Sequence, residues 1–315
     1  MTSGNAVLVA GSANLDFVVR APRIPAPGET ILGHCFATFP GGKGANQAVA
    51  CARAGGASTR MLLALGDDSF AVPLEQSLRS AGVDLEIVRT HEVSTGVAFI
   101  CLADDAENAI TVAPGANSAL RSEHLPKLSG ISHLLLQLET PMDTVVAWAR
   151  AAHAAGVQVV LNAAPARELP SGLLATIDTL IVNEGELALL SGVRGDVAAS
   201  LANIDVPRVF VTLGARGCCA RVDGEILLQS SFAVEAVDTT GAGDTFCGTL
   251  VAAFAQGAAP ANALRRACAA SALACTRLGA QSSVPAAREV EILFATGRET
   301  ASRDALAGYC GFPGQ

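Results

Sequence analysis

The stretch from Ala236 to Gly248 combines small residues, hydroxyls and carboxylates in an order that suits phosphate chemistry. Its pattern predicts a strand end, a tight turn of small residues, and a helix that runs through Leu250 and Phe254. The first N–H groups of a helix are unpaired, and with the positive end of the helix dipole they attract phosphate oxygens. Asp244 falls among them, either as a base for an alcohol that attacks the phosphate or simply as a helix cap.

A second glycine-rich segment, residues 41–48, opens another predicted helix that extends to about Ala54. It contains Lys43, one of only two lysines in the chain. Glycines allow a ligand to approach the backbone closely, and Asn46 falls in the first helical turn. A ligand-binding loop and a purely structural turn are the two interpretations of this segment.

Two polar residues follow the first predicted strand, residues 6–10. Asn14 and Asp16 are two positions apart, which places both side chains on the same side of an extended backbone. An amide and a carboxylate in this arrangement are suitable partners for sugar hydroxyls, although a polar turn would show the same pattern.

The composition excludes several classes of protein. The 315 residues are 50% hydrophobic and 16% charged, which predicts a large core and little disorder. A formal charge of −8 argues against binding to nucleic acid or to an anionic membrane. The nine cysteines form no CxxC pair or zinc-type spacing, so we expect free thiols and a cytoplasmic location. We expect neither a signal peptide nor an anchor, because the first apolar run is only as long as a strand.

The order of the predicted elements indicates an α/β fold. From residue 131 onward strands alternate with helices, which predicts a mostly parallel sheet covered on both faces. Segments 14–41 and 93–113 predict a small separate sheet, and residues 297–315 a polar peripheral tail. The other elements that we expect are strands at 6–10, 59–65, 131–138, 157–162, 178–182, 207–213, 217–222 and 225–229, and helices at 142–155, 184–191, 245–256 and 261–277.

The segments Gly41–Ala48 (GGKGANQA) and Asp238–Thr245 (DTTGAGDT) together resemble the two signatures of the ribokinase (PfkB) family of sugar kinases. The resemblance covers about residues 6–295 and includes Gln137–Glu139, Asn183–Glu186 and Thr276–Gln281. It implies one domain over residues 1–315 with a three-layer α/β/α fold, a mostly parallel central sheet and a small β-sheet lid. It also implies ATP-dependent phosphorylation of the 5-hydroxyl of D-ribose.

The same resemblance implies a role for each residue that matches a family position. Asp244 would be the catalytic base, and the backbone of Gly241, Ala242 and Gly243 the anion hole for the transferred phosphoryl group. The implied sugar-binding residues are Asn14, Asp16, Gly41, Gly42, Lys43, Gly44, Asn46, Glu139 and Asp244. The implied ATP contacts are Asn183, Thr212, Gly214, Gly217, Gly243 and Cys268, the last of which replaces a polar residue that is usual in the family.

Two metal ions are also implied. Glu186, with Asn183 in an NxxE motif, would organise Mg²⁺ through water, since Mg²⁺ retains most of its hydration shell. A potassium site beside the anion hole would use the side chains of Asp238 and Ser283 and the carbonyl groups of Thr240, Ala274, Arg277 and Gly279. The alternative for Asp238 is a turn-forming aspartate.

Other functions compete with a ribose kinase. A kinase of the same family could act on fructose, 2-deoxyribose, adenosine or pseudouridine, but a nucleoside favours aromatic stacking and only 4% of the chain is aromatic. A non-catalytic sugar sensor would not need Asp244, Asn183 and Glu186. An NAD-dependent oxidoreductase is excluded, because no GxGxxG motif follows the first strand. Exposed lid strands would need pairing, so we expect a homodimer formed through the lid.

Overall fold

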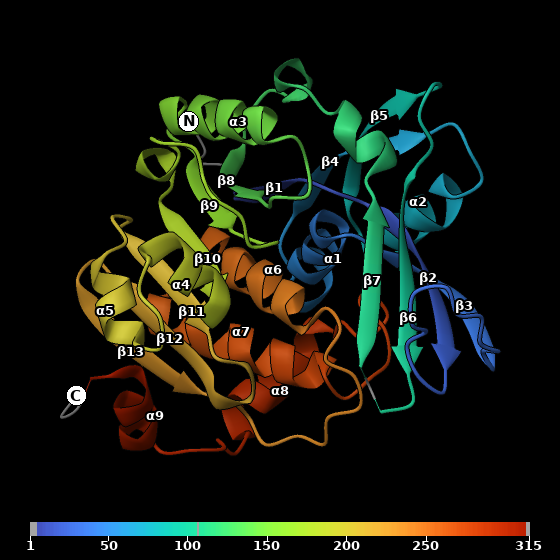
Figure 1. The fold of residues 1–315 in the computed structure, drawn as a ribbon. Coiled ribbons are helices and arrows are strands. Elements are labelled where there is room, and N and C mark those ends of the chain that lie inside the picture. The colour runs from blue at the N-terminus through green and yellow to red at the C-terminus, as the bar shows by residue number, and fades with distance from the viewer. Residues whose placement is uncertain (1–4, 106, 313–315) are drawn as a thin grey trace.

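The computed structural model describes residues 5–105 and 107–312. Within these ranges nine strands form the large sheet, and those from β11 to β5 run parallel while β12 and β13 are antiparallel to their neighbours (Figure 1). In spatial order they are β13 (Glu225–Ser230), β12 (Gly217–Val222), β11 (Arg208–Thr212), β10 (Thr179–Asn183), β9 (Gln158–Asn162), β8 (Ile131–Leu136), β1 (Ala6–Ala10), β4 (Thr59–Gly66) and β5 (Asp84–Thr90).

Helices cover both faces of this sheet, because its central strands are apolar on both sides. In β1 the side chains of Val7 and Val9 join one buried core, and those of Leu8 and Ala10 join the other. The first core includes α1 (Lys43–Val49), its π-helical extension η1 (Ala50–Ala54), α2 (Ala71–Ser80), α6 (Ala242–Ala255), α7 (Pro260–Ala274) and α8 (Ala287–Thr296). The second includes α3 (Met142–Ala154), α4 (Glu184–Ser191), α5 (Val197–Ala202) and α9 (Arg303–Cys310). The predicted three-layer architecture is confirmed.

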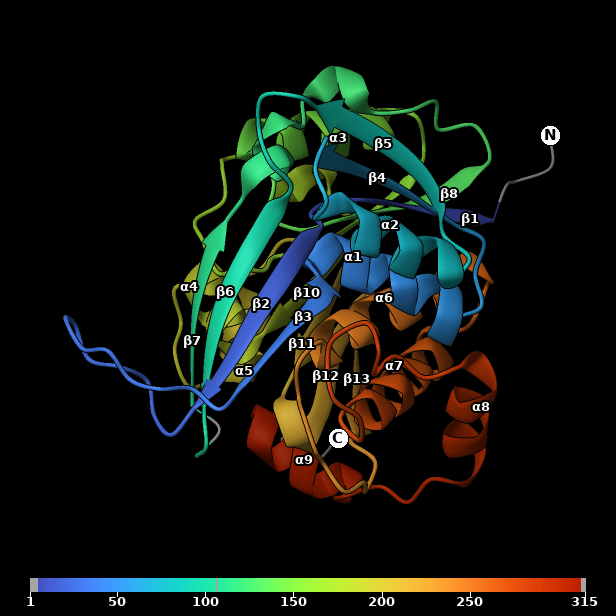
Figure 2. The same ribbon diagram turned by 90° about the vertical axis from the view of Figure 1, so that its right-hand side faces the viewer.

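A second sheet of four strands lies beside the large one in the described part of the chain (Figure 2). Its central strands β2 and β6 are parallel, and the two outer pairs are antiparallel. The order is β3 (Cys35–Gly41), β2 (Asn14–Ala21), β6 (Gly96–Ala103) and β7 (Asn108–Ala113). These strands fall within the segments 14–41 and 93–113 that the sequence assigned to a small sheet; residue 106 of the second segment lies outside the described residues.

Several elements differ from the sequence-based expectations, and helices α5 and α8 were not predicted at all. Helix α6 begins at Ala242 rather than Thr245, so Asp244 lies inside its first turn. Strand β5 forms an edge of the large sheet that its mixed sequence did not indicate. The segment after residue 296, expected to be peripheral, contains α9, whose Leu306 and Cys310 are buried against the core; residues 313–315 lie outside the described part. Tertiary burial outweighs the low local hydrophobicity of these two elements.

Candidate active site

The first turn of α6 is held by its glycine cap. Gly241 is the N-cap with φ of 74°, a conformation that favours glycine, and an added Cβ would lie 2.9 Å from the Cα of Ala280. The N–H of Ala242 donates to the carbonyl of Thr239 at 3.2 Å, so this member of the implied anion hole is already engaged. The N–H groups of Gly243 and Asp244 follow it at the open end of the helix, where an anion can be bound.

Asp244 is oriented by two side chains from α1. The amide nitrogen of Asn46 donates to Oδ2 of Asp244 at 2.9 Å, and that of Gln47 donates to Oδ1 at 2.8 Å. The carboxylate is buried, with a residue exposure of 8%. Asp244 is therefore no helix cap, because Gly241 occupies the cap position and the carboxylate is bonded to another helix.

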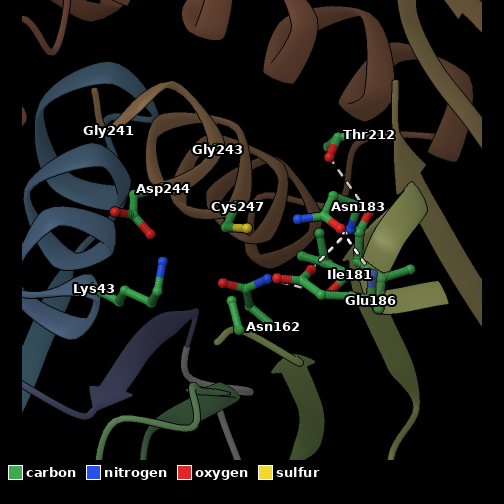
Figure 3. A pocket seen from close by; sticks show the side chains of 12 residues that line it. Lys43, Asn162, Ile181, Asn183, Glu186, Thr212, Gly241, Gly243, Asp244 and Cys247 are labelled. Carbon is green, nitrogen blue, oxygen red and sulfur yellow. Dashed lines mark hydrogen bonds between the residues drawn. The ribbon is translucent and has the colours of Figure 1, made fainter. Parts of the chain in front are cut away.

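A cavity of about 160 Å³ opens directly beside this carboxylate (Figure 3). Lys43 and Asp244 lie on one side of it, and Asn183 and Glu186 lie on the other. The negative charge of Asp244 raises the pKa of Lys43 and outweighs the opposing effect of burial. A permanent positive charge therefore faces the same space as the Asp244 carboxylate, which suits the binding of an anionic group.

The side chains predicted to bind sugar converge next to Asp244. Burial, with the nearby charges of Glu139 and Asp244, raises the pKa of Asp16 to about 7. Oε2 of Glu139 accepts hydrogen bonds from the Ser12 hydroxyl at 2.6 Å and from the backbone N–H of Lys43 at 3.0 Å. Glu139 thus also anchors the glycine-rich loop, a role that the sequence did not indicate. Gly42 and Gly44 bring the backbone of this loop against the turn after β1, and Gly41 lies against the Asp16 side chain.

Two asparagines in this cluster have a fixed orientation. Oδ1 of Asn14 accepts from Nδ2 of Asn117 at 2.8 Å, so the Asn14 amide nitrogen is the group left to donate to a ligand. Asn46 has the opposite polarity: its nitrogen is used by Asp244, and its Oδ1 is buried with no protein partner in the described structure. A buried acceptor without a donor indicates a ligand hydroxyl at this position.

The motif Asn183–Glu186 forms a reciprocal cap at the start of α4. Oδ1 of Asn183 accepts from the N–H of Glu186, and Oε2 of Glu186 accepts from the N–H of Asn183, both at 2.8 Å. Burial raises the pKa of Glu186. The motif therefore has a structural role besides the one implied by the resemblance, and both residues line the cavity.

A second cavity of about 440 Å³ adjoins the first, and both are lined by Thr212 and Gly243. Its walls are mainly apolar and hydroxyl-bearing side chains, among them Phe232, Val234 and Ser271, which suit a flat uncharged ring. The predicted nucleotide residues Thr212, Gly214, Gly217 and Cys268 all line it. Thr300, from the segment expected to be peripheral, forms part of the same wall.

The loop that precedes α6 meets the loop that follows α7 at Asp238. Its Oδ1 accepts from the N–H of Thr240 at 2.9 Å, and its Oδ2 accepts from that of Gly279 at 2.8 Å. Burial opposes ionisation, but these N–H donors outweigh it and lower the pKa of Asp238. The Arg277 side chain pairs with Glu289. The Ser283 hydroxyl donates to the carbonyl of Ala280 at 3.0 Å.

Some site residues were not predicted. Gln47 donates to both Asn162 and Asp244, and Asn117 and Ser12 hold the cluster that is predicted to bind sugar. Gln47 directly follows Asn46 in the first signature, which was the one available signal. In the described residues no group of three His, Cys, Asp or Glu is arranged to hold a metal. No helix of that part of the chain has the length and apolar character to span a membrane.

The fold and the site define an α/β phosphotransferase in which the start of one helix separates a polar pocket from an apolar one. The model of the pfkB family carbohydrate kinases matches residues 5–287, and the chain belongs to this family. The chain is 39% identical to ribokinase of Haemophilus influenzae over 293 residues, which cover 89% of this chain and 95% of the relative. Deoxyribokinase of Salmonella typhi is 33% identical over 89% of this chain and 95% of the relative. The structure of Arabidopsis thaliana ribokinase complexed with ribose and ATP matches with a TM-score of 0.85 and 32% identity, over 94% of this chain and all (100%) of that one.

Proposed function

We propose that this protein transfers the γ-phosphoryl group of ATP to the 5-hydroxyl of D-ribose, giving ribose 5-phosphate and ADP. The observation that carries the proposal is the position of Asp244. It lies at the junction of the sugar-binding cluster, the helix start and the cavity that continues into the apolar pocket. The family and the named relatives supply the substrate class.

In this proposal the sugar lies between Asn14, Asp16 and Asn46. The Asn14 amide donates to one hydroxyl, and the unpartnered Oδ1 of Asn46 accepts from another. A buried pocket that satisfies each hydroxyl discriminates strongly against analogues that lack one, by up to about 10⁴-fold. The small sheet would close over the sugar as a lid and exclude water, which prevents transfer to water instead of sugar.

Asp244 acts as the general base in the proposed reaction. Its carboxylate accepts the proton of the attacking hydroxyl while the new O–P bond forms and the bond from phosphorus to the ADP oxygen breaks. The N–H groups of Gly243 and Asp244 and the Lys43 ammonium stabilise the charge on the transferred group. Thr212, Gly214, Gly217 and Cys268 would hold the adenosine.

The site also fits the two cations that the resemblance implies. Asn183 and Glu186 present amide and carboxylate oxygens at the cavity wall, the donors that hydrated Mg²⁺ prefers. When bound, Mg²⁺ would neutralise charge on the phosphates. For K⁺ the resemblance implies Asp238 and Ser283 with the carbonyl groups of Thr240, Ala274, Arg277 and Gly279, a set of oxygen ligands, and hydrogen bonds from the N–H groups of Thr240 and Gly279 already hold their loops at Asp238. Asp238 orders the loop next to Gly241 through its own hydrogen bonds, and bound K⁺ would strengthen that order.

We also propose that the protein is a homodimer formed through the lid. Strand β7 is exposed along its whole length and forms one edge of the small sheet. Phe36 and Phe99, which are 61% and 57% exposed, provide an apolar surface that a second copy could cover. Analytical ultracentrifugation of the wild type and of Phe99→Lys tests this, and a monomeric wild type contradicts it.

The decisive experiment measures ADP release with Mg-ATP and a panel of D-ribose, 2-deoxyribose, fructose, fructose 6-phosphate and adenosine, in KCl or NaCl. Asp244→Asn serves as the paired variant, and we expect it to lose about 10²–10⁴-fold in kcat on ribose while still binding the sugar. Preferred turnover of 2-deoxyribose would retain the mechanism and change the substrate. The absence of turnover with every sugar, with ribose still bound, would favour a sensor.

A further inference from the structure

Two buried glutamines form a chain of hydrogen bonds that ends on Asp244. Nε2 of Gln137 donates to Oε1 of Gln47 at 2.7 Å, and Nε2 of Gln47 donates to Oδ1 of Asp244 at 2.8 Å. The same Gln47 nitrogen donates to Oδ1 of Asn162 at 2.9 Å. Both glutamines are 1% exposed or less, so these bonds are not exchanged with bulk water.

The neighbours of Gln47 fix the direction of its amide. Nδ2 of Asn162 donates to the carbonyl of Ile181 at 3.1 Å, so Asn162 must present its oxygen to Gln47. Gln137 presents its nitrogen to the Gln47 oxygen. Both hydrogens of the Gln47 nitrogen are therefore used, one on Asn162 and one on Asp244. Turning the amide round would place its oxygen against the buried carboxylate of Asp244 and the oxygen of Asn162, and both of these bonds would be lost.

The surrounding backbone is shaped to admit this chain. Gln137 directly follows β8 in the chain, and its side chain passes Gly11 at the end of β1. A Cβ at position 11 would lie 1.9 Å from Oε1 of Gln137, so any residue larger than glycine at this position would collide with the Gln137 side chain. The residues joined lie just after β8, in α1, at the end of β9 and in α6, so the chain of hydrogen bonds connects the sheet to Asp244.

We infer that Gln47, held by Gln137, is a positioning residue for the catalytic base. It keeps the Asp244 carboxylate in the one orientation in which it accepts the proton of the sugar hydroxyl. The catalytic role of Asp244 belongs to the proposed function, on which this inference rests. The hydrogen-bond chain itself is independent of the substrate.

Gln47→Glu is the most informative variant, because it keeps the size of the side chain and replaces its nitrogen by oxygen. The introduced carboxyl group repels Asp244 when it is ionised, whereas its protonated form donates to Asp244 as the amide does. The ratio of kcat in Gln47→Glu to kcat in the wild type should therefore rise by about tenfold or more as the pH falls from 8 to 6. The exposed control Gln76→Glu should keep a constant ratio.

Gln47→Leu and Gln137→Leu complete the test. Gln47→Leu should lower kcat by about 10- to 100-fold with the KM for ATP nearly unchanged, since a hydrogen bond to a charged group is lost. Gln137→Leu leaves Asp244 untouched and frees Gln47, so its effect should be smaller, and the double variant should be no worse than Gln47→Leu. A pH-independent ratio for Gln47→Glu, or additive effects in the double variant, overturns the inference.

Thermal unfolding gives a readout that needs no turnover. The Tm difference between Gln47→Glu and the wild type should grow as the pH rises from 6 to 8, because two carboxylates then face each other in a buried site. A Tm difference that does not change with pH overturns the inference even if no sugar is phosphorylated. Wild-type turnover of ribose with no effect at Gln47 overturns the inference alone and leaves the proposed function intact.

Discussion

The amide of Asn46 donates to Oδ2 of Asp244 at 2.9 Å, while the amide oxygen of the same residue is buried without a partner. One side chain thus contacts the proposed base and presents an unsatisfied acceptor to the proposed sugar. The donating nitrogen and the accepting oxygen of the Asn46 amide can therefore be tested separately.

Asn46→Asp replaces the donating nitrogen by oxygen and places a second carboxylate beside Asp244. We expect kcat/KM for ribose to fall by about 10²-fold, because a hydrogen bond to the base is lost and like charges face each other. Steady-state kinetics check this against Asn203→Asp, the same change at an exposed position in the described structure. Equal activity of the two variants would contradict the role of Asn46.

The pKa of Asp16, raised to about 7 by burial and by Glu139 and Asp244, makes stability depend on pH. Between the ordinary value of 3.8 and about 7, the folded protein retains a proton that the unfolded chain has released. The free energy of unfolding contributed by Asp16 therefore decreases as the pH rises through this range. Denaturant unfolding from pH 4 to 8 should show Asp16→Asn gaining stability relative to the wild type, whereas the exposed control Asp205→Asn should not.

Glu186→Gln separates the cap of α4 from the chemistry of the cavity. Glutamine at the third helical position can still accept from the N–H of Asn183, so the Tm should change by less than about 2 °C. The loss of charge should raise the Mg²⁺ concentration needed for half-maximal rate by about tenfold. The matched control is Glu184→Gln. In the wild type the Glu184 carboxylate accepts a hydrogen bond from the hydroxyl of Tyr309. An unchanged Mg²⁺ requirement would remove Glu186 from the proposed site.

Asp238→Asn tests the proposed potassium site. Asparagine has one acceptor oxygen, so the bonds from Thr240 and Gly279 cannot both be kept, and a carboxylate charge is lost. We expect stimulation by KCl over NaCl, at equal ionic strength, to disappear in this variant. A rate that is stimulated equally in the wild type and the variant would place the cation elsewhere.

The residues alone indicated most of the fold. Strands such as Ala6–Ala10 are apolar on both faces and bounded by glycine or polar residues, so local pattern decides their structure. Strand β5 and helix α9 were missed for the opposite reason. Their sequences are mixed, and burial against distant elements stabilises them.

The two glycine-rich signatures predicted where phosphate and sugar would be bound, because helix starts and turns are local features of the chain. The contacts that orient the Asp244 carboxylate are not local. Gln47 and Asp244 are 197 positions apart, and Asn14 and Asn117 are 103 apart. Which atom of each amide donates and which accepts depends on the groups that the folded chain brings together. Around Asp244 this is decided only by the packing of α1, β9 and α6 against its buried carboxylate.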